Sequence, residues 1–106
     1  MTVATEIDSA NVNADLGYSD AAVMQRKASM AAELAKGIKA RCLTQEAAED
    51  LLGIDRAKLS KITRGQVRGV SEAKLLGLVA RLGHDVIIIV SKAKHQGPGK
   101  IELEFA

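Results

Sequence analysis

The sequence predicts a mainly α fold, a bundle of four to five helices with a C-terminal β-hairpin. Apolar residues recur at helical spacing between residues 19 and 83. Good capping residues, Thr44, Asp55 and Ser71, stand at the starts of short apolar segments. After Gly83 the pattern changes to β-branched residues, which favour strands. The 106 residues are one domain's worth, and we divide them into an acidic arm (1–18), a helical domain (19–83) and the hairpin (84–106).

The arm and the first helix differ in their patterning. Residues 1–18 mix Thr, Asn, Asp and small residues without a period, so we expect a loose, flexible arm. The first helix starts at Ser19 or Asp20, whose side-chain oxygens accept hydrogen bonds from first-turn amides. Met30, Leu34 and Ile38 recur every four residues. They predict one apolar stripe on a helix of about 20 residues.

Two short helices joined by a tight turn are expected next. Thr44 caps a helix through Leu52, and Gly53 ends it because glycine enters the left-handed conformation at little cost. Asp55 caps the second helix, which ends at Gly65. The sharp turn predicts that the second helix crosses the first steeply and leaves one face projecting outward.

The C-terminal part begins with a last helix, which Ser71 caps and Gly83 ends. Residues 86–90 are apolar on both alternating sets, which predicts a strand covered on both faces. Residues 94–99 are rich in turn formers. In residues 101–105 apolar residues alternate with glutamates, which predicts a strand with one buried face.

Composition excludes several classes of protein. The single cysteine, Cys42, cannot form an internal disulfide, and one Cys with two His cannot build a four-ligand zinc site. The longest strongly apolar run, residues 86–90, is far short of the roughly 20 residues that span a bilayer. The N-terminus lacks the pattern of a signal peptide. We therefore expect a cytoplasmic protein without membrane, metal or cofactor, and, since no catalytic constellation stands out, not an enzyme.

The formal net charge of +2 conceals an uneven distribution. Residues 1–20 hold four acidic residues and no Lys or Arg, which gives −4, so the remaining residues sum to +6. Residues 54–74 hold six basic and two acidic residues, a local charge of +4. Such a basic segment suits the phosphates of nucleic acid.

The second helix of the predicted pair is the strongest functional signal. An α-helix fits the major groove of B-DNA, and its N-terminal residues then meet base edges. Arginine pairs bidentately with guanine, alanine allows close approach or touches a thymine methyl, and lysine reaches a base or a phosphate. We expect base contacts from Arg56, Ala57, Lys58 and Lys61, and phosphate contacts from Gln45, Ser60, Arg64 and Arg68.

These segments read LTQEAAEDLLGI at residues 43–54, LSKI at 59–62 and RG at 64–65, and residues 22–83 resemble the Xre/Cro family of helix-turn-helix regulators. The resemblance implies a lambda-repressor-like bundle. The longer frame, with an acidic arm ending in DLGY and a long first helix, is most similar to HigA-like antitoxins of toxin–antitoxin operons. That resemblance implies a dimer that binds operator DNA, represses its own operon and binds a RelE-like ribonuclease toxin.

Two residues depart from the family's pattern. Glu49 stands where the family usually has a small residue against the second helix, so it must lean outward or widen the crossing. Cys42 stands where Gly or Asn is usual, and it would be mildly strained in a left-handed conformation.

The expected hairpin bears on the oligomeric state. Two strands alone are marginal in water, and an apolar strand with an open edge needs a cover. A two-fold dimer supplies that cover and sets two recognition helices about 34 Å apart, one turn of the groove. The expected dimer interface is Val86, Ile87, Ile88, Ile89 and Val90. The alternative is that helices of the same chain cover the hairpin.

The expected function is a homodimeric, sequence-specific repressor of double-stranded operator DNA, and by resemblance an antitoxin. The acidic segment of residues 1–20 is the first candidate for contacting a basic toxin. Two alternatives stay open: a stand-alone Xre-type phage or host regulator without a toxin, and a protein-interaction module that does not bind DNA.

Overall fold

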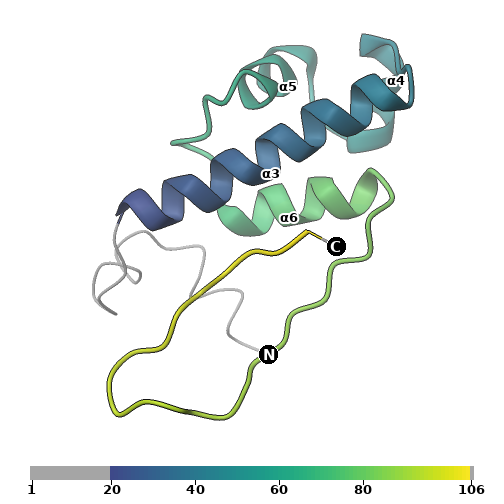
Figure 1. Cartoon of the computed structure of the whole chain (residues 1–106). Coiled ribbons are helices and arrows are strands. Elements are labelled where there is room, and N and C mark those ends of the chain that lie inside the picture. The colour runs from purple at the N-terminus through teal and green to yellow at the C-terminus, as the bar shows by residue number, and fades with distance from the viewer. Residues whose placement is uncertain (1–19, 106) are drawn as a thin grey trace.

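The computed structural model describes residues 20–105, which form four α-helices (Figure 1). They are α3 (Asp20–Ala40), α4 (Gln45–Leu52), α5 (Arg56–Thr63) and α6 (Glu72–Arg81). The predicted flexible arm, residues 1–18, lies outside the described residues. The mainly helical prediction is confirmed for the described part.

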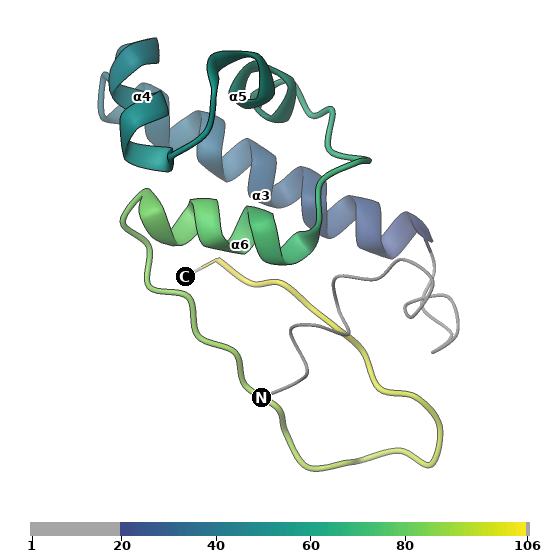
Figure 2. The same cartoon turned by 180° about the vertical axis from the view of Figure 1, so that it is seen from behind.

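The two longer helices, α3 and α6, lie side by side and run parallel (Figures 1 and 2). Near their starts Arg26 pairs with Glu72, and near their ends Gly37 of α3 faces Leu82 just after α6. A Cβ atom at Gly37 would overlap the Leu82 side chain, so this glycine is what allows the ends of the two helices to approach. The short helices α4 and α5 pack across the same pair and complete the core.

The core is aliphatic, as the near absence of aromatic residues requires. Its largest fully buried side chains come from all four helices and from the segment after α5, which contributes Val67. Those side chains are Met30, Leu34, Leu52, Ile62, Leu75, Leu78 and Val67. The predicted helical stripes are therefore the buried faces.

The predicted caps are confirmed by their hydrogen bonds. Thr44 Oγ1 accepts from the Ala47 amide at 3.1 Å and Asp55 Oδ1 from the Lys58 amide at 2.8 Å. The Ser71 hydroxyl accepts from the Lys74 amide at 3.0 Å. In each case one orphan donor of the first turn is satisfied by the side chain at the N-cap.

The end of α3 places Cys42 in the left-handed region, with φ 53°. The Leu43 amide donates to the Ile38 carbonyl and the Cys42 amide to the Lys39 carbonyl, which is the bond pair of a Schellman motif. Gly65 and Gly83 hold the equivalent position after α5 and α6. Cys42 therefore adopts the conformation that the sequence identified as strained.

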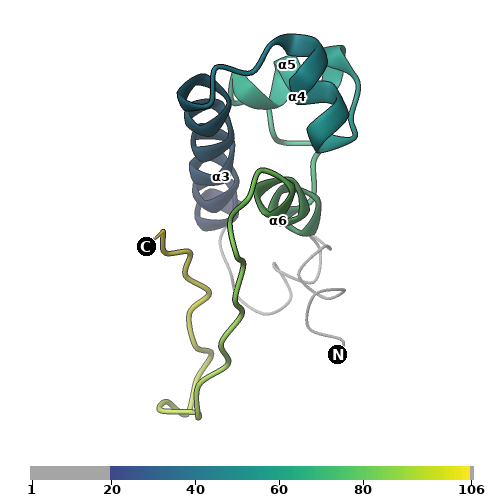
Figure 3. The ribbon, with the colours of Figure 1, turned by 90° about the vertical axis from the view of Figure 1, so that its right-hand side faces the viewer.

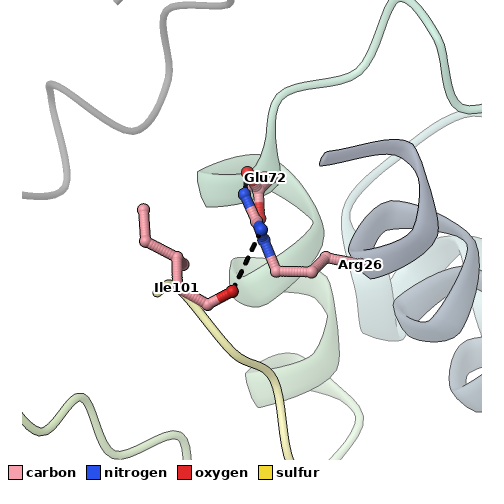
Figure 4. A network of polar contacts seen from close by, with 3 residues as sticks. All are labelled: Arg26, Glu72 and Ile101. Atoms are coloured by element: carbon pink, nitrogen blue, oxygen red, sulfur yellow. Dashed lines mark hydrogen bonds and ion pairs between the residues drawn. The ribbon is translucent and has the colours of Figure 1, made fainter. Parts of the chain in front are cut away.

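A buried ion pair joins α3 to α6 and to the C-terminal segment (Figure 4). Arg26 Nε and Nη2 donate to the two Glu72 oxygens at 2.7 and 2.9 Å, and Nη1 donates to the Ile101 carbonyl at 3.1 Å. This contact is not among those predicted from the sequence. Its signal was a charged residue on the apolar stripe, since Arg26 stands three residues after Val23 and four before Met30, both buried.

The predicted C-terminal β-hairpin is not supported, because no residue of the described chain belongs to a strand. After α6 the chain runs away from the helices as an outgoing leg, which contains residues 86–90, and comes back as a returning leg, which contains residues 101–103 (Figures 1 and 3). The returning leg docks on the helices through Ile101 and Leu103 instead of pairing with the outgoing leg. A ladder needs backbones about 4.8 Å apart along the strands, and docking the returning leg on the helices separates it from the outgoing one.

The outgoing leg is exposed rather than covered. Ile87 is 79%, Ile89 80% and Val90 75% exposed, while Val86 and Ile88 are less so. The prediction that both faces of residues 86–90 are buried is therefore wrong for the single chain. Equally, the helices of the same chain do not cover these residues.

Candidate nucleic-acid interface

The α4–α5 pair is built by a three-residue connection, Gly53 to Asp55, between two helices of eight residues each. Gly53 adopts φ 69° and its amide donates to the Glu49 carbonyl at 2.8 Å, which ends α4. Asp55 then caps α5 immediately. The turn is short because Gly53 ends α4 and Asp55, two residues later, caps α5.

One face of α5 is buried and the opposite face is exposed, as the helical period of the sequence predicts. Leu59 and Ile62 are buried, while the predicted base-contacting residues are all exposed. These residues are Arg56, Ala57, Lys58 and Lys61. The surface that they form, here named the α5 face, carries three positive charges and points away from the core.

Three of the predicted contact residues lie along one shallow cleft of about 270 Å³ between the end of α3, α4 and α5. Arg56 and Ser60 line it from α5 and Gln45 from the start of α4. Lys39 of α3 joins them, although the sequence analysis did not name it as a contact residue. Its signal was the crowding of cations in the last turns of α3. The cleft thus has donors from three helices on its walls, with apolar side chains such as Ile38, Leu43 and Leu59 between them.

Arg56 is not free of protein contacts. Its Nε lies 3.5 Å from Glu49 Oε2, across the turn between the two helices. The Arg56 side chain is 64% exposed and that of Glu49 28%, so the Glu49 side chain lies partly buried beside α5. The departure from the family's small residue is accommodated without removing α5 from the core.

Arg68 stands apart from this group, whereas Arg64 adjoins it through Ser60. Arg64 Nε donates to the Ser60 carbonyl at 3.2 Å, at the C-terminal end of α5. Arg68 pairs with Asp20 at 3.3 Å, near the start of α3. The cleft reaches Ile38, about 27 Å along α3 from Asp20 at 1.5 Å per residue. The predicted phosphate contacts therefore do not form one cluster.

Residues 20–105 hold no group of three or more His, Cys, Asp and Glu side chains arranged for a metal ion. No helix in that range is long and apolar enough to cross a membrane.

Comparison with known proteins agrees with this geometry. Residues 12–91 match the family described as "Helix-turn-helix domain". A solved structure described as an XRE family transcriptional regulator matches with a TM-score of 0.72 and 30% identity. The match covers 83% of this chain and 100% of that one. No relative is found among curated proteins.

Proposed function

The chain belongs to the helix-turn-helix family and is of the Xre type, and from this premise we propose that it is a sequence-specific repressor that reads duplex DNA with α5. The observation that carries the proposal is the α5 face: Arg56, Ala57, Lys58 and Lys61 are exposed while Leu59 and Ile62 anchor the helix from behind. The solved relative is itself described as a transcriptional regulator. The chain performs no catalysis of its own under this proposal.

Under this proposal the predicted contact residues bind two parts of the DNA, the base edges and the phosphates. Arg56, Ala57, Lys58 and Lys61 meet base edges in the major groove, where arginine selects guanine. Gln45, Ser60 and Arg64 hold phosphates on either side, together with Lys39, which shares their cleft. Arg68 reaches a phosphate only by leaving Asp20, and both side chains are exposed enough for that exchange.

The active species under this proposal is a homodimer joined through residues 86–90. Large aliphatic side chains are unfavourable in water, and fully burying one of them stabilises by about 1.5–3 kcal/mol. Ile87, Ile89 and Val90 are at least 75% exposed in the single chain. Sedimentation of the wild type should give a dimer, and Ile87→Lys with Ile89→Lys should give a folded monomer. A wild type that stays monomeric at micromolar concentration contradicts the dimer.

The proposal also concerns which protein, if any, binds this regulator. The charge of −4 on residues 1–20 suits a basic partner, and the HigA-like frame suggests a RelE-like ribonuclease toxin. The second candidate is a stand-alone regulator without a toxin, and the description of the solved relative as a transcriptional regulator fits either candidate. A neighbouring reading frame for a small basic protein, toxic alone and co-purifying with this chain, supports the antitoxin. Its absence selects the stand-alone regulator.

A gel shift with the chain's own upstream region tests DNA binding. We expect a shift that weakens as salt rises, because binding releases counterions from the phosphates, and that an unrelated duplex of equal length does not compete away. Failure to shift any duplex at low salt would leave the helices as a protein-interaction module. Equal competition by the unrelated duplex would remove the sequence-specific part of the proposal.

A further inference from the structure

Glu49 faces the α5 face from the neighbouring helix. The structure holds its carboxylate 3.5 Å from Arg56 Nε, and the Gly53 amide fixes the Glu49 backbone by donating to its carbonyl. Arg56 is the first residue of α5 and its side chain is 64% exposed. An acidic side chain therefore stands beside the arginine that is best placed to reach a base.

Stability alone does not explain this ion pair. Arg56 is 64% and Glu49 28% exposed, so water screens much of the attraction, and ordering the side chains costs entropy, which leaves the pair a small contribution to folding. A carboxylate beside DNA also repels phosphates and weakens binding to every sequence. The pair has a use only if the placement of the Arg56 side chain matters.

The contacted atom indicates what that placement is. A guanidinium offers its donors in a fixed planar fork, with Nε on one side edge and the two terminal nitrogens forming the end edge. The ion pair brings a Glu49 oxygen to 3.5 Å from Nε, on the side edge of the fork, and leaves the end edge open to another acceptor. Guanine presents O6 and N7 in the major groove, which accept two hydrogen bonds from such a fork.

We propose that Glu49 is a positioning residue that holds the Arg56 guanidinium ready for bidentate pairing with guanine, and so sets the base preference at that position. Holding the side chain before contact removes part of the ordering cost of binding, and only a base that accepts both bonds gains from it. The inference rests on the proposed DNA binding, and it assigns to Glu49 a role in selectivity rather than in affinity.

The test compares Glu49→Gln with Asp50→Asn. Glu49→Gln keeps the shape and removes the charge. Asp50→Asn removes a charge from the same helix, at an exposed residue with no ion pair among residues 20–105. The probe is a pool of duplexes with a randomised core, from which wild type selects a preferred sequence. Each variant is then titrated against that sequence and its single-base changes.

We expect Glu49→Gln to lower the discrimination for guanine at one base pair per half-site about tenfold, and Asp50→Asn to leave it unchanged. In an Arg56→Ala background, Glu49→Gln should have no further effect on discrimination. The inference is overturned if Glu49→Gln and Asp50→Asn raise affinity for all duplexes by the same factor with preferences unchanged.

A second measurement needs no DNA. In the free protein the Arg56 Nε–H signal in a ¹⁵N NMR spectrum should be resolved in wild type and in Asp50→Asn, and shifted toward the free-arginine position in Glu49→Gln. An Arg56 signal identical in all three overturns the pairing, whatever the binding data. A wild type that enriches no duplex from the pool overturns the proposed function, and this inference with it, while the NMR result still reports on the pair.

Discussion

The buried pair between Arg26 and Glu72 gives the sharpest stability prediction. The two side chains are 9% and 5% exposed and share two hydrogen bonds of 2.7 and 2.9 Å. Removing Arg26 leaves the buried Glu72 carboxylate without its guanidinium, so Arg26→Met should lower the free energy of unfolding by about 3–5 kcal/mol, and Glu72→Leu should also destabilise the fold. Replacing both together by these apolar residues should cost less than either single change, because no charge is then stranded.

Urea denaturation followed by circular dichroism measures this, at one fixed protein concentration because dimerisation would add to the apparent stability. Lys100→Met is the matched control, since its pair with Glu102 is exposed on both sides and should contribute less than about 1 kcal/mol. The reasoning is refuted if Arg26→Met costs no more than Lys100→Met. It is also refuted if the double variant loses the sum of the two single losses, which would mean that the two charges do not compensate each other.

Four further substitutions test the fold. Gly37→Ala should cost about 1–3 kcal/mol because its Cβ meets Leu82, whereas Gly77→Ala, with open space around it, should stabilise α6 by about 0.5–1 kcal/mol in thermal unfolding; equal effects would contradict the close helix approach. Cys42→Gly should stabilise by about 0.5–1 kcal/mol net, since relief of the left-handed strain exceeds the added entropy of the unfolded chain, and a loss of stability would contradict this. Asp55→Ala should cost about 1 kcal/mol through loss of its cap on α5, and an unchanged denaturation midpoint would argue against the cap.

The helices were predictable because their signals are local. A capping oxygen and a glycine that permits φ 69° act within a few residues, so Thr44 and Gly53 mark α4 without knowledge of the rest of the chain. The exposed α5 face follows in the same way from the helical period of Leu59 and Ile62.

The features that the sequence did not predict depend on contacts between residues far apart in the chain. Arg26 and Glu72 are 46 residues apart, and no local pattern matches them as a pair. The hairpin prediction was not supported for a related reason. The β-branched residues make residues 86–90 suitable for a strand but do not specify which segment pairs with it, and the returning leg packs against the helices instead. The pair between Arg68 and Asp20 likewise joins residues 48 apart in the chain, and the phosphate contact predicted for Arg68 stays a prediction.

The central claim, that the α5 face reads duplex DNA, is tested most directly by fluorescence anisotropy with the duplex selected from the randomised pool and a scrambled duplex of the same composition. The account predicts that at 0.15 M salt the selected duplex binds about a thousandfold tighter than the scrambled one, and that Arg56→Ala relaxes selectivity at one base pair at a cost of about 1–3 kcal/mol. Equal affinity for the two duplexes would contradict it, as would an Arg56→Ala variant that weakens binding to both by the same factor.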